Sequence, residues 1–294
     1  MKTQIECFPC FARQAVLTLG NVNMAEANKL DVIRAVLQEM EGADVSQPPA
    51  YATTFIYRMI RELTGEDPYK ELKARYNAIA LELYPRLRAQ VFGHYDPLWM
   101  ATRLAIAGNI IDFGIFTNVD IEGTIQRALE HRIEVDDYEA FKQALTIDNH
   151  GKGAELLYLL DNAGEIVFDK LLIEVLGGMG KDVTAVVKGF PVINDVTMQD
   201  AGDVGLDAVC KVIDNGSDAV GTITTLCSSD FLARFNTHSF IISKGQGNYE
   251  TLCGNDKDIF FLFQAKCDVV ARHLGLKVGA MLLKRNKYET GVHA

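Results

Sequence analysis

The second half of the chain alternates between two kinds of apolar pattern. From about Asp148 onward, short apolar runs typical of strands are separated by segments whose apolar residues recur at helical spacing. Strands that alternate with helices form a parallel sheet, because each helix returns the chain to the start of the next strand and covers one face. We therefore predict an α/β fold whose mostly parallel sheet carries helices on both faces. The expected strands are residues 155–160, 183–187, 208–213, 240–243, 259–263 and 278–283, and the expected helices are 166–176, 196–203, 226–235 and 266–274.

The first half of the chain carries only the helical pattern. Its breaks fall at turn-forming residues, and the pairs Asp67-Pro68 and Asp96-Pro97 are typical helix starts, because aspartate caps a helix and proline fits its first position. We expect a helical domain over residues 1–107 and an α/β domain over residues 108–294, with a boundary that lies between 105 and 150. The expected helices are residues 12–19, 27–40, 49–63, 69–90, 97–107 and 121–130.

Composition narrows the classes of function. The formal net charge of −10 argues against a protein that binds nucleic acid, because such a protein needs a basic face. No run approaches the roughly 20 apolar residues of a membrane span, and no secretory signal follows Lys2. The 6 cysteines are spread along a chain that is too long to need disulfide bonds, so we expect a cytoplasmic protein. The sequence does not predict an oligomeric state.

Polar residues follow several of the expected strands. Asp161-Asn162 follows the first strand, the loop after the second reaches Asn194-Asp195, and Asp214-Asn215 follows the third. The carboxyl ends of parallel strands meet at one edge of a sheet, where ligands bind in open α/β folds. Oxygen ligands suit Mg²⁺ or Mn²⁺, so Asp161 and Asp195 are candidates to share one divalent ion with Asn162. Asp and Asn are also ordinary turn residues, and each pair taken alone has that simpler explanation.

Positive charge and glycine occur at the same expected edge. Lys188 ends the second strand, and Ser243, Lys244 and Gly245 end the fourth. The two lysines are candidates to neutralise a phosphate drawn to the metal ion, and glycine lets backbone N–H groups approach an anion closely. A metal ion with a lysine is the usual apparatus of phosphoryl transfer, in which charge stabilisation dominates. The simpler alternatives are a solvent-facing lysine and a flexible turn.

Several other chemistries lack their motifs. The sequence has no Gly-x-x-x-x-Gly-Lys-Ser/Thr loop for ATP, no Gly-x-Gly-x-x-Gly turn after the first strand, and no Gly-x-Ser-x-Gly nucleophile elbow. Two other classes of function stay open. One is a methyltransferase that uses S-adenosylmethionine in the same α/β crevice, and the other is a non-catalytic protein that binds a metal ion or a metabolite.

Three segments considered together resemble a known family. They are Asp161-Asn162-Ala163-Gly164-Glu165, Lys188-Gly189-x-Pro191-x-x-Asn194-Asp195-x-Thr197-x-x-Asp200-Ala201 and Ser243-Lys244-Gly245-Gln246-Gly247-Asn248. In this combination the chain resembles the DUF89 family, whose members include metal-dependent damage-control phosphatases. Cys7-Phe8-Pro9-Cys10 and residues 108–114 match its prokaryotic, cysteine-containing branch. The resemblance extends over nearly the whole chain.

The resemblance implies both a fold and a site. The fold would be a helical amino-terminal domain packed on a Rossmann-like, three-layer α/β/α domain. The site would hold a divalent ion (Mg, Mn, Co or Ni) on Asp161, Asn162 and Asp195. Lys244 would bind the phosphate, with Asn109 and Asp112 lining the substrate site. The substrates of better-understood branches, sugar phosphates or phosphopantetheine-type compounds, do not carry over, because this chain has the cysteine-bearing pattern.

The cysteine pair has a separate interpretation. Cys7 and Cys10 precede an expected helix, and a helix amino terminus favours the thiolate. A second metal or iron–sulfur site there would need further ligands, for which the candidates are Cys210, Cys227, Cys253 and Cys267. The alternative is a reduced pair that packs within the helical domain.

We therefore predict a divalent-metal-dependent phosphatase that hydrolyses phosphomonoesters of a small phosphorylated metabolite. Asp161 is expected as a metal ligand and a candidate base, and Lys244 as the group that stabilises transferred charge. Either direct attack by water or a covalent aspartyl phosphate fits these residues. The substrate-binding residues are expected to be Asn109, Asp112, Lys188, Ser243 and Gly245.

Overall fold

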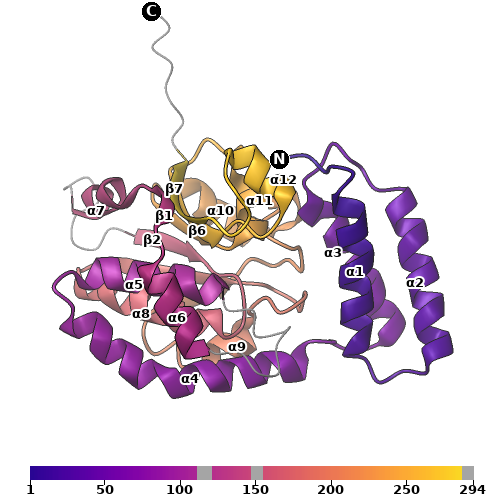
Figure 1. Ribbon diagram of the computed structural model, residues 1–294, viewed down its shortest axis with the longest axis horizontal. Helices are drawn as coiled ribbons and strands as arrows, with labels where there is room; N and C mark the ends of the chain where they lie inside the picture. The colour runs from indigo at the N-terminus through magenta and orange to yellow at the C-terminus, as the bar shows by residue number, and fades with distance from the viewer. Residues whose placement is uncertain (111–120, 147–154, 287–294) are drawn as a thin grey trace, which may run out of the picture.

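A seven-stranded sheet forms the centre of the structure, a computed structural model that describes residues 1–110, 121–146 and 155–286 (Figure 1). The strand order is β1-β7-β6-β5-β2-β3-β4, and neighbouring strands run parallel except for the antiparallel pair β6 and β7. The mostly parallel sheet is therefore confirmed. The strands are β1 (Ile133–Asp136), β2 (Glu155–Leu159), β3 (Asp182–Val187), β4 (Lys211–Asp214), β5 (Ile241–Lys244), β6 (Ile259–Gln264) and β7 (Met281–Asn286).

The strand order places a ligand crevice at one position. From β2 the chain proceeds to β3 and β4 on one side, and then returns to β5 and β6 on the other side of β2. The connections that leave β2 and β5 therefore run to opposite halves of the sheet. In open α/β sheets, such a switch leaves a crevice beyond the carboxyl ends of the two adjacent strands. Here those ends carry Asp161 and Lys244.

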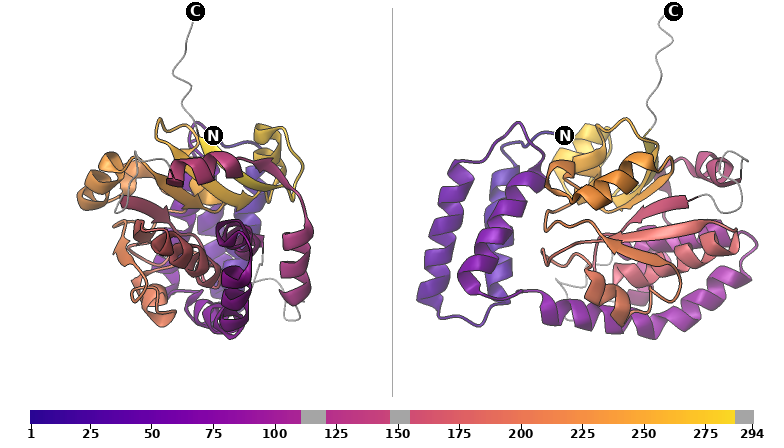
Figure 2. Two further views of the ribbon diagram at one scale, coloured as in Figure 1. Left: turned by 90° about the vertical axis from the view of Figure 1, so that its left-hand side faces the viewer. Right: turned by 180° about the vertical axis from the view of Figure 1, so that it is seen from behind.

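Helices cover both faces of the sheet, as the two views of Figure 2 show. Leu156 and Tyr158 of β2 point into one apolar core, whereas Leu157 and Leu159 point into the other. Burial on both sides explains why the strands read as continuous apolar runs. The three-layer α/β/α architecture is confirmed. One face carries α4 (Lys70–Gly93), α5 (Pro97–Ile110), α6 (Ile121–Glu130), α7 (Tyr138–Thr146), α8 (Glu165–Gly178) and α9 (Met198–Asp203), and the other carries α10 (Ser229–Thr237), α11 (Gln246–Leu252) and α12 (Asp268–Leu274).

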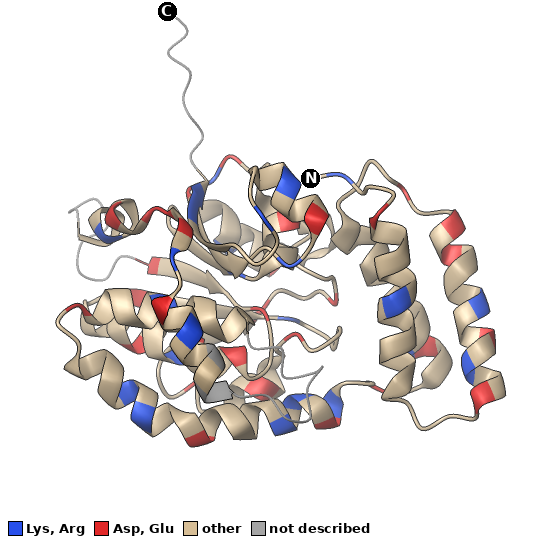
Figure 3. Ribbon diagram, viewed as in Figure 1, with Lys and Arg blue, Asp and Glu red and all other residues tan. Residues whose placement is uncertain are grey.

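The first three helices form a separate layer at the end of the sheet (Figure 1). They are α1 (Cys7–Gly20), α2 (Glu26–Glu41) and α3 (Pro49–Thr64), and they pack around an apolar core to which Val269 of α12 also contributes. Arg58 and Arg61 of α3 form ion pairs with Asp218, in the long loop after β4, at 2.5 and 2.7 Å. Acidic and basic residues are interspersed along α2 and α4 (Figure 3).

Helix α4 and most of α5 lie before residue 108, but these two helices cover the sheet and do not pack into the bundle of α1, α2 and α3. Gly108 of α5 shows how closely they pack, because a Cβ atom there would lie 3.1 Å from the ring of Phe168 in α8. The division into residues 1–107 and 108–294 stays a prediction. Among the described residues, no helix is both long and apolar enough to span a lipid bilayer.

Several expected elements differ from the observed ones. The strand expected at residues 208–213 begins only at Lys211, because this edge strand is half exposed and its apolar pattern is weak. The strand expected at 278–283 is β7, which begins at Met281 and runs antiparallel to β6. Helix α7 and the short strand β1 were not expected. The glycine-rich segment after Lys244 was expected as a loop, but it forms α11.

Candidate active site

The carboxyl ends of β2 and β5 meet at the crevice. The two strands are paired in register, with Leu159 opposite Ser243, so the residues that follow them lie side by side. Gly245 has a φ of 81° and a ψ of 159°, a combination that is almost restricted to glycine. Because Gly245 has no side chain, its backbone packs directly against the carboxylate of Asp161. The predicted role of Gly245 in binding an anion stays a prediction.

Asp161 lies at the end of β2, and its carboxylate is almost fully buried. Its Oδ2 atom accepts hydrogen bonds from Nδ2 of Asn162 at 2.6 Å and from Nδ2 of Asn109 at 3.1 Å. The same two amides donate to Oε2 of Glu165, at 3.1 and 2.9 Å. Two asparagines thus hold two carboxylates next to each other at the start of α8.

The loop after β3 brings Asp195 to the same place. An isolated antiparallel bridge joins Asn162 to Asp195, the N–H of Val196 donates to the carbonyl of Asp161 at 2.9 Å, and the N–H of Ala163 donates to the carbonyl of Asn194 at 2.9 Å. The structure thus brings the three predicted metal ligands together. Their role as ligands stays a prediction.

The loop that carries Asp195 is strained. Ile193 has a φ of 45°, which is unusual for a β-branched residue. Such strain persists only where the surrounding structure imposes it, and it occurs often at functional sites.

Buried carboxyl groups outnumber buried ammonium groups inside this edge of the sheet. The buried ammonium groups of Lys188 and Lys244 face four buried carboxylates, those of Asp161, Glu165, Asp169 and Asp195. Nζ of Lys188 lies 3.4 Å from Oδ2 of Asp195, and Nζ of Lys244 lies 2.6 Å from Oε1 of Glu165 and 2.7 Å from Oδ1 of Asp169. An added divalent cation would balance the excess.

Burial and mutual repulsion raise the pKa values of three of these carboxyl groups. Burial, together with repulsion from Glu165 and Asp195, raises the pKa of Asp161 well above its usual range. Burial raises the pKa of Asp195 to about 6 although Lys188 opposes the shift. Burial raises the pKa of Asp169 to about 7 although Lys244 opposes it. A cation at this edge would favour the ionised carboxylates.

The donor set fits a hard divalent ion. Oδ2 of Asp195 is buried and accepts no hydrogen bond within the described part of the molecule. Asn162 turns its Nδ2 toward Asp161, and a rotation of that amide by half a turn would present its oxygen instead. In residues 1–110, 121–146 and 155–286, no three His, Cys, Asp or Glu side chains are arranged to hold a metal ion by themselves. Two carboxylates and one amide would therefore bind an ion that keeps several waters, as Mg²⁺ usually does.

Lys244 is less accessible than its predicted role requires. Its side chain is fully buried, and besides Glu165 and Asp169 its ammonium group donates to the carbonyl of Ala105 at 2.8 Å. An ammonium group has three hydrogens, so all of them are used by protein acceptors. Direct contact between Lys244 and a phosphate stays a prediction, and it would require Lys244 to give up one of these partners.

Lys188 and Asn109, two of the other predicted substrate-binding residues, are also held by protein partners. Nζ of Lys188 donates to the carbonyl of Gly221 in addition to its ion pair with Asp195. Asn109 is buried, and its Oδ1 accepts the N–H of Gln264 at 3.2 Å. Ser243 is fully buried in β5. Asp112 lies outside the residues that the structure describes.

Two residues at this edge were missed by the sequence analysis as site residues. Glu165 contacts Asn109, Asn162 and Lys244. Its place in the segment Asp161–Glu165 was the signal in the sequence that could have identified it as a site residue. Lys266 lies two residues after the carboxyl end of β6, and its exposed charge is the largest one that lowers the pKa of Asp161. It was assigned to a helix at residues 266–274, whereas α12 begins only at Asp268.

The cysteine pair lies at the start of α1, with Cys7 buried and Cys10 exposed. Burial raises the pKa of both thiols, and the Cys267 thiol adds to the shift of each. Of the further ligands considered, Cys267 is therefore the one that lies near both. All 6 cysteines are free thiols. A second metal or iron–sulfur site here stays a prediction.

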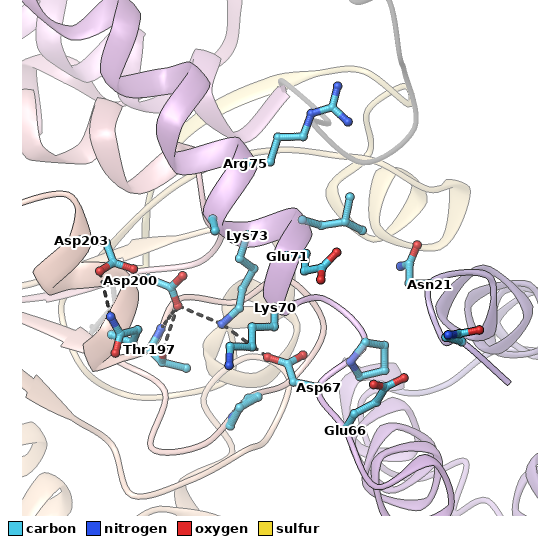
Figure 4. A pocket seen from close by; sticks show the side chains of 16 residues that line it. Asn21, Glu66, Asp67, Lys70, Glu71, Lys73, Arg75, Thr197, Asp200 and Asp203 are labelled. Carbon is cyan, nitrogen blue, oxygen red and sulfur yellow. Dashed lines mark hydrogen bonds and ion pairs between the residues drawn. The ribbon is translucent and has the colours of Figure 1, made fainter.

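A cleft of about 1300 Å³ opens beside the candidate site. The start of α4 and the segment from Thr197 to Asp203 line it, and Figure 4 shows Lys73 between Asp67 and Asp200 at its wall. Asp161, Asn162 and Asp195 do not line the cleft. Lys73 instead connects the cleft to the site, because it lines the cleft and its Nζ lies 3.5 Å from the carbonyl oxygen of Asp195.

Comparison with known proteins gives a consistent result. The model of the damage-control phosphatase ARMT1-like domain matches residues 3–282. The chain is 33% identical to damage-control phosphatase PH1575 of Pyrococcus horikoshii, over 98% of this chain and 100% of that protein. It is 36% identical to the uncharacterized protein MJ0202 of Methanocaldococcus jannaschii, over 97% of this chain and 96% of that one. The crystal structure of the DUF89 family protein PH1575 superimposes with a TM-score of 0.89 at 31% identity, covering 98% of this chain and 100% of that chain.

Proposed function

The chain belongs to the damage-control phosphatase ARMT1-like family, also called DUF89, and from that premise we propose that it is a divalent-metal-dependent phosphatase. Its substrate would be a small phosphorylated metabolite, and the reaction would be hydrolysis of a phosphomonoester. The observation that carries the proposal is the group formed by Asp161, Asn162 and Asp195 at the crevice, within an edge where buried carboxylates outnumber buried ammonium groups.

In this proposal Asp161, Asn162 and Asp195 hold the ion. A divalent ion bound there would stabilise negative charge on a phosphate oxygen and make a bound water more acidic. Asn109 holds Asp161 in place through its Nδ2, and Lys188 does so for Asp195 through their ion pair. Lys244 offsets the charges of Glu165 and Asp169, which leaves the carboxylate of Asp161 for the ion.

The proposal assigns the phosphate contact to Lys266 in addition to the residues expected from the sequence. Lys266 is exposed, and its ammonium group makes no hydrogen bond or ion pair with any described residue. Its backbone N–H donates to Oε1 of Gln246 at 2.8 Å, which anchors it beside α11 and the end of β5. A lysine whose donors no described residue uses, and whose charge acts on Asp161, is suited to bind a phosphate dianion.

The proposal is tested by assaying hydrolysis of p-nitrophenyl phosphate by chelator-treated protein to which Mg²⁺, Mn²⁺, Co²⁺ or Ni²⁺ is returned. Hydrolysis should depend on the added ion and should fall by at least about 100-fold in Asp161→Asn, because second-sphere changes alone cost up to about that factor. Asp182→Asn is the matched control, since Asp182 is exposed at the opposite end of β3. Equal hydrolysis by wild type and Asp161→Asn would refute the assigned site.

The substrate is addressed by a second experiment. A panel of sugar, nucleotide and cofactor phosphates is assayed with the preferred ion. A phosphatase of this kind should release phosphate from at least one small metabolite in the panel. A protein that binds the ion but turns over no member of the panel would instead be a non-catalytic metal-binding protein.

A further inference from the structure

Two buried side chains of α4 contact the segments around the candidate metal ligands, one at the turn of Asp161 and both at Asp200 of α9, shortly after Asp195. Lys73 and Asn77 are four residues apart, so they project from the same face of the helix. Both are almost fully buried, and neither is a candidate ligand. Polar groups buried to this degree are retained where they have specific partners, so the partners of these two residues indicate their role.

Asn77 joins the turn of Asp161 to α9, the helix that follows the loop of Asp195, with its two amide atoms. Its Oδ1 accepts the N–H of Gly164 at 2.7 Å, in the turn that begins with Asp161. Its Nδ2 donates to Oδ1 of Asp200 at 3.2 Å, in the segment that follows Asp195. Gly164 has a φ of 78° and precedes the first residue of α8, so this hydrogen bond satisfies a free N–H at the helix start.

Lys73 holds the second turn from the same helix. Its Nζ donates to Oδ2 of Asp200 at 2.9 Å and lies 3.5 Å from the carbonyl oxygen of Asp195. Oδ2 of Asp200 also accepts the N–H and the hydroxyl of Thr197, each at 2.8 Å, which completes a capping box at the start of α9. Figure 4 shows the side chains of Lys73 and Asp200 pointing toward each other beside the cleft. Asp200 is therefore fixed between α4 and the loop of Asp195.

We propose that Asn77 is a positioning residue that sets the spacing between Asp161 and Asp195, and with it the affinity of the site for a divalent ion. This inference rests on the proposed function, because it assumes that those residues bind the ion. The two turns also contact each other directly, but those backbone hydrogen bonds join one turn to the other and neither of them to α4. Asn77 ties both the turn of Asp161 and the start of α9, which follows the loop of Asp195, to α4. Groups that orient metal ligands in this way change metal affinity about 10- to 100-fold when lost.

The test measures binding of Mn²⁺ by calorimetry, independently of activity, and melting temperature in the absence of metal. Asn77→Leu has a similar volume and removes both hydrogen bonds. We expect its Kd for Mn²⁺ to rise at least about tenfold and kcat at saturating Mn²⁺ to stay near the wild-type value. The matched control is Tyr84→Phe, which removes a hydrogen bond to Glu174 between the same helices, α4 and α8, away from the turns. Its Kd for Mn²⁺ should not change.

Two outcomes separate this inference from the proposed function. In the first outcome, wild type binds Mn²⁺ and Asp161→Asn does not, while Asn77→Leu binds Mn²⁺ as wild type does but melts at a lower temperature. Asn77 is then only structural, and the inference is overturned. If Asp161→Asn binds Mn²⁺ as tightly as wild type, the proposed function itself fails. Should Asn77→Leu not fold, Asn77→Asp keeps the acceptor for Gly164 and loses the donor to Asp200. An unchanged Kd in that variant would also overturn the inference.

Discussion

A Cβ atom on Gly245 would lie 1.9 Å from Oδ2 of Asp161. The backbone of Gly245, just after β5, therefore packs directly against the carboxylate of Asp161, the candidate metal ligand that follows β2. Any side chain at position 245 must displace that carboxylate.

The first prediction follows from this contact. Gly245→Ala should lower stability by about 1–3 kcal/mol, because alanine rarely adopts this backbone conformation. It should also weaken Mn²⁺ binding, because Asp161 must move. Thermal unfolding and calorimetry check the two effects. Gly254→Ala is the control, since nothing lies within 4 Å of a Cβ atom there. Normal Mn²⁺ affinity in Gly245→Ala would show that Asp161 does not bind the ion.

The second prediction concerns Lys244. Lys244→Met should destabilise the protein by about 3–5 kcal/mol at neutral pH, because it leaves the buried carboxylates of Glu165 and Asp169 without their counter-charge. Denaturant unfolding measures the loss, and Lys211→Met at an exposed position of β4 provides the control. A variant of normal stability with a raised KM would instead identify Lys244 as a phosphate ligand that is free to move.

The third prediction concerns pH. The folded pKa values of Asp169, about 7, and Asp195, about 6, lie above the ordinary value of 3.8. A raised folded pKa means that the folded state binds protons more tightly, so this stability is present at low pH and is lost as pH rises through 6 and 7.

The metal-free protein should therefore melt at a lower temperature at pH 8 than at pH 5.5. Because an ion binds the ionised carboxylates, the rise in melting temperature caused by saturating Mg²⁺ should grow over the same range. Melting curves with and without Mg²⁺ give both quantities. A rise in melting temperature that is independent of pH would contradict the carboxylate site.

The fourth prediction separates Lys266 from the metal ligands. Lys266→Met should raise KM for a phosphate ester about tenfold or more, since removing a charge-assisted hydrogen bond costs about 1.5–3 kcal/mol. Its melting temperature should stay unchanged, because the side chain is exposed, and its Mn²⁺ affinity should not weaken, because a positive charge that acts on Asp161 is removed. Lys277→Met, also exposed, is the matched control. An unchanged KM in Lys266→Met would remove this lysine from the substrate site.

Much of the fold was predictable because local patterns agree with the tertiary structure. Helix α6 and strand β3 match the expected bounds closely, since the sequence of each carries a clear apolar pattern. Strand β7 was misplaced because its residues Lys284 to Asn286 are polar and only pairing with β6 makes them a strand. Helix α11 was missed because Gly245 and Gly247 look like a flexible turn, whereas Gly245 is the N-cap of the helix.

The site was predictable to a lesser extent. Asp161, Asn162 and Asp195 could be grouped because residues at the carboxyl ends of neighbouring parallel strands must meet. The burial of Lys244 could not be predicted, because a strand-end lysine looks the same whether it faces solvent or two carboxylates. Asn77 could not be found either, since its partners are 87 and 123 residues away in the sequence.

Anomalous diffraction from a crystal of this protein soaked in Mn²⁺ tests the central claim most directly. We predict a single strong peak within about 2.0–2.4 Å of carboxylate oxygens of Asp161 and Asp195, with the amide oxygen of Asn162 turned toward it. A crystal that shows these side chains as they lie here, with no anomalous density between them at saturating Mn²⁺, would contradict it.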